Sequence, residues 1–88
     1  MDDRPISFAV EVKFKRIFYN DKLILCKDWQ MKRYKDFGIA FNMPVFILHG
    51  VGGTPYNPKD LYIIPLTDDI SHVLSIKQVE QYRTISNI

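Results

Sequence analysis

The feature that most constrains the fold is a run of alternating apolar and polar residues over residues 6–15. Residues two apart on a β-strand point to the same side of the sheet. One face of this predicted strand is therefore apolar, and the other carries Glu11 and Lys13 side by side. A carboxylate and an ammonium held in this way can bind a divalent metal and polarise a phosphate or a water molecule. The alternative interpretation is an ordinary half-buried strand with a solvated, mixed-charge face.

Length and composition indicate one soluble domain spanning residues 1–88. Of its residues, 47% are hydrophobic and 25% are charged, which is typical of a globular protein. Cys26 has no second cysteine to pair with, and with only His49 and His72 beside it a Cys/His zinc site is not expected. No apolar run reaches the roughly 18 residues of a membrane span, and no signal-peptide pattern opens the chain. We therefore expect a cytoplasmic protein.

Charge is distributed unevenly along the chain. Residues 1–35 carry nine basic and five acidic side chains, whereas residues 36–88 carry three basic and five acidic ones. A basic half is typical of an electrostatic footprint for nucleic acid, although surface lysines also serve solubility. The candidates for phosphate contacts are Lys15, Arg16, Lys32, Arg33 and Lys35.

The residues after the alternating run predict a second strand. Asn20-Asp21 is a turn signal, and the chain then returns to apolar residues at 23–25. We expect a β-hairpin, or a strand with an extended loop.

A helix is predicted next, over roughly residues 29–41. Asp28 is its candidate N-cap, and Pro44 requires the helix to end before it, because proline disfavours helical conformation in the preceding residue. Apolar side chains recur at mostly helical spacing and predict the packing face of this helix. They are Trp29, Met31, Tyr34, Phe37 and Phe41.

The second half of the chain predicts two more strands and a short helix. Residues 44–51 form an apolar run without alternation, as expected for a strand covered on both faces. Residues 60–66 form another β-rich run that ends near Pro65, which lacks an amide donor. The glycine- and proline-rich segment between these runs is predicted to be a loop. Ser75 is the candidate cap of a C-terminal helix that reaches Arg83.

The order of these elements predicts an α/β fold, with a small mixed β-sheet, one main crossover helix and a short C-terminal helix. We expect residues 6–66 to form the core and residues 67–88 a C-terminal tail. Such a sheet normally needs cover on both of its faces. With one strong helix in the sequence, the second face is expected to be open, covered by the tail, or covered by another chain such as a second copy in a homo-oligomer.

Gln30 and Tyr34 lie four residues apart and share one face of the predicted helix. The helix follows the strand of Glu11 and Lys13 and crosses the same sheet. This amide and phenol are therefore candidates to orient a metal-bound water or a phosphate oxygen. The alternative is that Tyr34 belongs to the packing face, with Gln30 at its edge.

Together these motifs resemble the PD-(D/E)XK nuclease superfamily, which has a restriction-endonuclease-like core. The resemblance lies in an apolar strand ending in Glu11-Val12-Lys13, a following helix with Gln30-x-x-x-Tyr34, and the later strands at 45–51 and 61–64. It implies a hydrolase of phosphodiester bonds, a nuclease acting on DNA with magnesium or manganese as cofactor.

The resemblance also implies a role for each matching residue. Glu11 would be a metal ligand, and an upstream aspartate, for which Asp3 is the candidate, would be another. Lys13 would sit beside the attacking water as the catalytic lysine. Gln30 and Tyr34 would be auxiliary catalytic residues.

The alternative function is a catalytically inactive module of the same fold, used for nucleic-acid binding or for subunit assembly. Other candidate sites are weaker. We expect His49 to be a hydrogen-bonded residue at the edge of the core, and Cys26 has no base spaced to activate its thiol. The glycines that follow His49 lack the lysine and the helix of a phosphate-binding loop.

Overall fold

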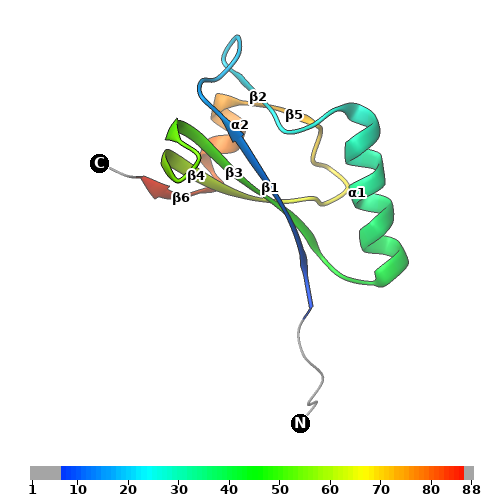
Figure 1. The fold of residues 1–88 in the computed structure, drawn as a ribbon. Helices are drawn as coiled ribbons and strands as arrows, with labels where there is room; N and C mark the ends of the chain where they lie inside the picture. The colour runs from blue at the N-terminus through cyan, green and yellow to red at the C-terminus, as the bar shows by residue number, and fades with distance from the viewer. Residues whose placement is uncertain (1–6, 87–88) are drawn as a thin grey trace.

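The structure, a computed structural model, describes residues 7–86 and is drawn in Figure 1. Its elements confirm the expected α/β class, a mixed sheet with two helices. In chain order they are β1 (Ala9–Lys15), β2 (Lys22–Ile24), α1 (Asp28–Phe41), β3 (Val45–Thr54), β4 (Asn57–Pro65), β5 (Val73–Ser75), α2 (Ile76–Glu80) and β6 (Arg83–Ser86).

The main sheet has the strand order β1-β3-β4-β6. β1 and β3 are parallel neighbours joined through α1, which is the predicted crossover, whereas β4 is antiparallel to both β3 and β6. The register of the parallel pair sets Glu11 beside Ile47 and Lys13 beside His49. A parallel pair cannot be joined by a tight turn, so the chain must leave the sheet and return, and α1 forms that connection.

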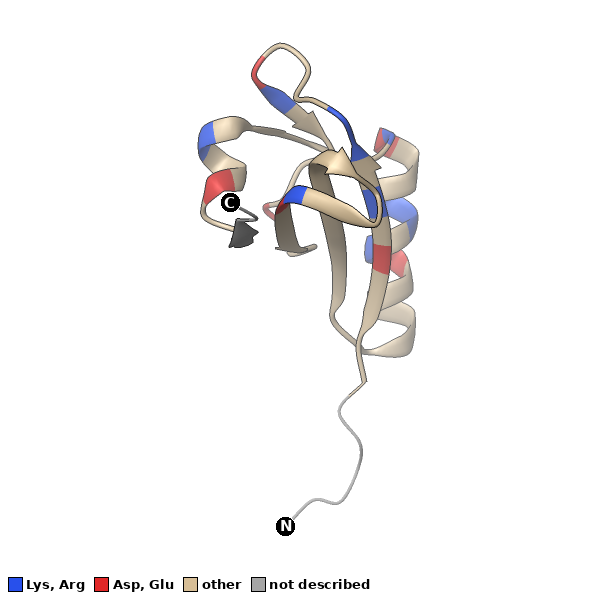
Figure 2. Cartoon of the chain, turned by 60° about the vertical axis from the view of Figure 1, so that its left-hand side comes forward, with Lys and Arg blue, Asp and Glu red and all other residues tan. Residues whose placement is uncertain are grey.

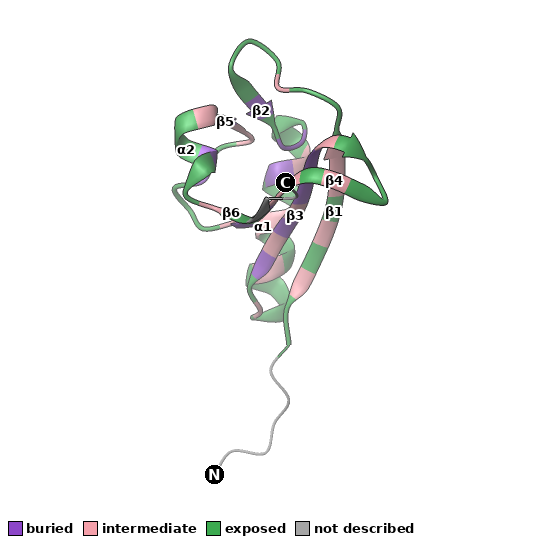
Figure 3. Ribbon diagram, turned by 90° about the vertical axis from the view of Figure 1, so that its left-hand side faces the viewer, coloured by how far each residue is buried: buried purple, intermediate pink, exposed green. Residues whose placement is uncertain are grey.

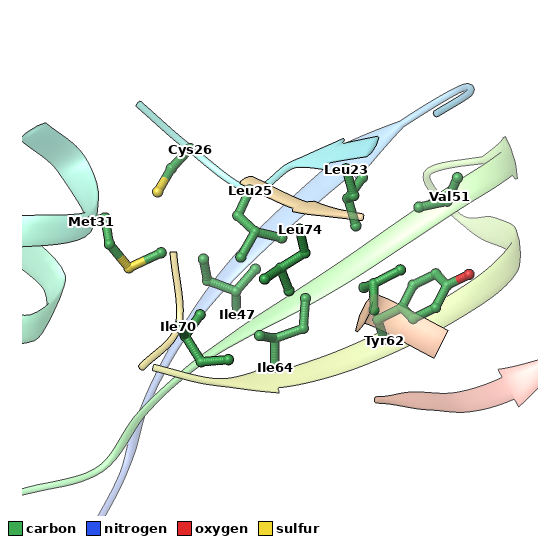
Figure 4. Close-up of a cluster of buried hydrophobic side chains, with 11 residues drawn as sticks. Leu23, Leu25, Cys26, Met31, Ile47, Val51, Tyr62, Ile64, Ile70 and Leu74 are labelled. Atoms are coloured by element: carbon green, nitrogen blue, oxygen red, sulfur yellow. The ribbon is translucent and has the colours of Figure 1, made fainter. Parts of the chain in front are cut away.

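One face of the main sheet is covered by α1, by the small β2–β5 sheet and by α2, which all contribute to one cluster of buried side chains (Figures 1 and 4). Alternate residues of β3 and β4 point into this cluster, and Ile47 and Ile64 at its centre are completely buried. The cluster comprises Leu23, Leu25, Cys26, Met31, Ile47, Val51, Tyr62, Ile64, Ile70, Leu74 and Val79.

No described element covers the opposite face of the sheet. Phe8 and Val12 are 59% and 68% exposed there, and Val10 and Ile63 are each 44% exposed. Figure 3 shows the resulting alternation of exposed and intermediate residues along β1. The expectation that residues 44–51 form a strand covered on both faces is therefore wrong, because β3 is covered by a second layer on one face only.

The ends of α1 differ slightly from the prediction. Lys27 is the N-cap, and Asp28, which we expected as the cap, is the first helical residue. A carboxylate in the first turn still favours the helix, because the N-terminus of a helix carries partial positive charge. The helix ends where Asn42 adopts a left-handed conformation with φ of 50°.

The predicted hairpin of residues 6–15 with residues 23–25 is wrong. Asn20 and Asp21 do form a two-residue turn with positive φ, closed by reciprocal hydrogen bonds between Tyr19 and Lys22. Beyond the turn, however, β2 leaves β1 and pairs with β5. Burial of Leu23, which is 1% exposed, in the core accounts for this choice of partner.

Two further predictions are corrected in the second half of the chain. The expected loop over residues 52–58 is a tight hairpin, because β3 runs to Thr54 and β4 starts at Asn57. Gly53 makes this possible, since its φ is +68° and a Cβ there would lie 2.5 Å from the carbonyl oxygen of Asn57. The C-terminal helix is capped by Ser75 as predicted but ends at Glu80, and the chain continues as β6, paired with β4.

Because the sheet is covered on one face, two truncations on neighbouring strands should lower the free energy of unfolding by very different amounts. Ile47→Ala should lower the free energy of unfolding by about 2–5 kcal/mol, because the lost side chain leaves a cavity in the core. Val12→Ala should change it by less than about 1 kcal/mol, because that side chain is already exposed. Urea denaturation of both variants measures the difference, and equal losses would contradict a sheet that is open on one face.

Candidate functional site

β1 turns its charged side chains toward the covered face of the sheet. Glu11 and Lys13 lie on the face that carries α1. Their chain neighbours Val10 and Val12 point to the open face. This is the reverse of an ordinary half-buried strand, in which the apolar residues pack and the charges are solvated. The alternative interpretation of the alternating run as such a strand is therefore wrong for β1.

The two charged groups lie close together and remain accessible. Lys13 Nζ is 3.8 Å from Glu11 Oε1, and the two side chains are 27% and 44% exposed, respectively. An ion pair this exposed contributes little to stability. Breaking this ion pair would therefore cost little, and Glu11 could then bind a metal ion and Lys13 an anionic ligand.

α1 brings the predicted helix residues to the same place. Glu11, Gln30 and Tyr34 line one cavity of about 430 Å³ between β1 and α1. Lys13 lines an adjoining hollow, together with Gln30, Cys26 and His49. Gln30 thus borders both spaces, whereas Glu11 and Tyr34 line only the first and Lys13 only the second.

Gln30 and Tyr34 also have structural contacts. Oε1 of Gln30 accepts a hydrogen bond of 2.9 Å from the backbone N–H of Lys27, which fixes the amide at the start of α1. Its Nε2 donates no hydrogen bond to the part of the chain that the structure describes. Tyr34 packs against the buried cluster while lining the cavity, so both of its predicted roles are compatible with its position.

The site offers few oxygen donors from the described residues to a metal ion. Glu11 is the one carboxylate among the described residues that line the cavity, and residues 7–86 contain no group of three or more His, Cys, Asp or Glu that could hold a metal. The N–H of Ala9 donates to Pro44 on the β3 side, so alternation turns the Val12 carbonyl to the free edge of the sheet. Magnesium commonly takes one or two carboxylates and completes its shell with water and substrate phosphate. Asp3, the predicted second ligand, lies outside the described residues.

His49 lies beside Lys13 and is completely buried. Its Nδ1 is 3.0 Å from the carbonyl oxygen of Gly50, so Nδ1 donates and Nε2 is an acceptor. Nε2 has no hydrogen-bond partner among the described residues. Burial, reinforced by the charges of Lys15 and Lys13, lowers the pKa of His49 below its ordinary value of 6.5. The ring is therefore neutral, as the predicted hydrogen-bonded residue should be, although it lies inside the core.

Cys26 is 7% exposed in the same region. Burial raises the pKa of its thiol, with a smaller opposing effect from Lys13. A thiol that resists ionisation is a poor nucleophile, so the position of Cys26 does not favour it as a nucleophile.

The five predicted phosphate contacts lie in different places (Figure 2). Arg33 lines the cavity, and Lys15 and Arg16 are exposed at the end of β1. Lys32 lies on the other flank of α1, near Asp28 and Asp36. Lys35 donates to the backbone oxygens of Asp68 and Ile70, at 3.3 and 2.6 Å, and so ties α1 to the loop before β5.

The sequence prediction missed two residues of α1 that line the cavity, namely Trp29 and Phe37; Arg33, which also lines it, was predicted as a phosphate contact. The two aromatic residues were predicted to pack, but they are 54% and 43% exposed. Met31 is buried as predicted, and Gly38 approaches the sheet so closely that a Cβ there would lie 3.0 Å from Val45 Cγ2. The signal that could have located Trp29 and Phe37 in the cavity is their spacing of four from Arg33, next to Gln30 and Tyr34.

Burial of neutral His49 predicts a pH-dependent stability. Because its pKa is lowered in the folded state, the unfolded chain binds a proton that the folded chain does not when the pH falls below 6.5. The free energy of unfolding should therefore fall as the pH drops from about 7.5 to about 5.5. His49→Gln should flatten this slope, whatever its effect on absolute stability. Urea denaturation across that pH range measures the free energy of unfolding of both proteins. Parallel pH profiles of the wild type and His49→Gln would contradict the prediction.

Comparisons with known proteins complete the description of the site. No protein-family model, curated protein or solved structure matches the chain. Within residues 7–86, no helix is both long and apolar enough to span a membrane. The resemblance to PD-(D/E)XK nucleases therefore rests on the motif residues of the sequence alone.

Proposed function

We propose that the chain is a metal-dependent phosphodiester hydrolase of the PD-(D/E)XK type, with a restriction-endonuclease-like core and DNA as its substrate. The observation that carries the proposal is the inverted β1, which turns Glu11 and Lys13 toward α1 and leaves apolar Val12 in solvent. Turning charges toward a packed layer and apolar side chains toward water costs free energy. Such a local conflict is typical of functional sites rather than of structural ones.

The metal in this proposal is magnesium or manganese. Glu11 would hold it, with the Val12 carbonyl at the free edge of β1 and Asp3 as further oxygen ligands. When bound, the ion polarises the phosphate and lowers the pKa of a water ligand. Lys13, 3.8 Å from Glu11, is placed to hold the attacking water or to offset negative charge that develops on the phosphate.

Gln30 and Tyr34 act as positioning groups in this proposal. Gln30 and Tyr34 line the same cavity as Glu11. Both can donate hydrogen bonds to non-bridging phosphate oxygens. Fixed donors around a phosphate contribute to catalysis because they need not reorganise during the reaction.

Arg33 lines the cavity, Lys15 lines the adjoining hollow, and Arg16 is exposed next to Lys15 in the chain. These three cations would supply the contacts that position a DNA backbone. Lys32 and Lys35 lie farther around α1 and would contribute to the general positive field.

Cleavage of DNA tests the proposed function. Duplex, single-stranded and branched substrates should be cut in the presence of magnesium or manganese and left intact in a chelator. Glu11→Gln and Lys13→Met should each reduce the rate by about 10²-fold or more, because they remove the metal ligand and the cation at the phosphate. Lys77→Met on α2, far along the chain from the site, is the matched control and should cut at the wild-type rate.

Two outcomes would contradict the assignment. Cutting that survives both Glu11→Gln and Lys13→Met would place the activity elsewhere or in a contaminant. DNA binding without cutting, unchanged by Glu11→Gln, would favour the inactive nucleic-acid-binding module.

A second candidate function, self-association, is favoured by the open face of the sheet. Phe8, Val10 and Ile63 are exposed there and line an apolar groove with Phe46 and Leu48, and Val12 is exposed on the same face. Contiguous apolar surface of this kind commonly marks an interface. Two copies packed face to face would bury it and supply the missing second layer.

Sedimentation velocity distinguishes this second candidate. A self-associating chain should change from dimer to monomer in Val10→Lys, which places a charge in the apolar groove. Ile17→Lys, at a position that is 75% exposed in the loop after β1, should leave the dimer intact. A wild-type protein that stays monomeric at all concentrations would exclude the homo-oligomer.

A further inference from the structure

α1 carries an exposed row of side chains that neither the core nor the proposed catalytic groups explain. The row consists of Trp29, Arg33, Phe37 and Phe41, spaced four residues apart, and we call it the aromatic stripe. Its three aromatic members are 54%, 43% and 61% exposed. Residues four apart lie next to each other on one face of a helix, about 6 Å apart along its axis.

The members of the aromatic stripe are ordered by contacts with one another. The guanidinium of Arg33 lies over the Trp29 ring, 5.8 Å from its centroid. The rings of Phe37 and Phe41 are 4.5 Å apart with an interplanar angle of 36°. The stripe therefore presents flat rings and one cation to solvent in fixed positions, which is the composition of a stacking platform for nucleic-acid bases.

The aromatic stripe is continuous with the candidate site. Trp29, Arg33 and Phe37 line the same cavity as Glu11. A strand that stacks its bases on the stripe would therefore have its backbone beside Glu11 and Lys13. Bases in a duplex are stacked on one another and shielded from such a platform, whereas unpaired bases are free to stack on protein rings.

We propose that the aromatic stripe binds the unpaired bases of a single-stranded nucleic acid and delivers the strand's backbone to the candidate site. Binding to the stripe is independent of catalysis, and the delivery step rests on the proposed function. The preferred substrate would accordingly be a single strand, or a duplex with an unpaired end or branch, rather than a continuous duplex.

The chain contains its own probe for this binding, because Trp29 is the one tryptophan among the 88 residues. Titration with a 15-nucleotide oligodeoxythymidine in chelator should quench its fluorescence to saturation as a base stacks on the ring. The affinity should fall with salt because phosphates are also contacted. A duplex of the same length should need about tenfold or more higher concentration for the same quenching. An oligouridine arm shows whether the strand is restricted to DNA.

Variants locate the binding on the stripe. Phe37→Ala and Phe41→Ala should each weaken the affinity for the oligodeoxythymidine by about fivefold or more. Ile39→Ala is the matched control, because Ile39 is 77% exposed on the other flank of α1 and should bind like wild type. All three positions are exposed, so the substitutions leave the core unchanged.

The outcomes separate this proposal from the nuclease assignment. Quenching that persists in Glu11→Gln, with or without cleavage by the wild type, supports the stripe as a binding platform. The proposed binding by the stripe would be overturned by an absence of quenching or by equal affinity for the duplex. It would also be overturned if Phe37→Ala and Phe41→Ala bound like wild type, even if the protein cuts DNA. Trp29 emission that changes with protein concentration alone would also overturn it, by assigning the stripe to contacts between copies of the chain.

Discussion

The parallel pairing of β1 with β3 is the constraint on which the rest of the structure depends. Parallel neighbours require a crossover, and the crossover places α1 over one face of the sheet. The register of the pair then decides which side chains of β1 lie under the helix. It selects Glu11 and Lys13, beside Ile47 and His49, and turns Val10 and Val12 to the other side. A shift of one residue would bury the valines against α1 and remove the candidate site.

The same constraint makes the protein asymmetric. All of the described cover, from α1, α2 and the small β2–β5 sheet, lies on the face that contains the site. The core therefore fixes the position of Gln30 and Tyr34 relative to β1, while α1 keeps its outer flank free for the aromatic stripe. The apolar face of the sheet would be available for self-association. Catalysis and strand binding would thus share one side of the domain, and assembly would use the other.

Sequence patterns could predict the elements that are long and strongly periodic. The parallel strands, α1 and the grouping of Glu11 with Gln30 and Tyr34 follow from alternation, helical spacing and the crossover argument. The partner of β2 could not be predicted, because three apolar residues fit either a hairpin or a second sheet. β6 was not predicted, because the predicted C-terminal helix extended to Arg83, its first residue. Helical spacing alone also cannot tell which residues of α1 are buried: Met31 is buried as expected, but Trp29 and Phe37 are largely exposed, and Gly38 lies closest to Val45 of the sheet.

The central claim is that Glu11 and the groups facing it form one metal site, and paramagnetic NMR tests it most directly. Mn²⁺ added to ¹⁵N-labelled protein should broaden the amide signals of Glu11 and Val12 and the side-chain amide of Gln30, and magnesium should reverse the effect by competition. Glu11→Gln should abolish the broadening while leaving the rest of the spectrum unchanged. Broadening centred on the acidic pair Asp68 and Asp69, or broadening at β1 that survives Glu11→Gln, would contradict the account.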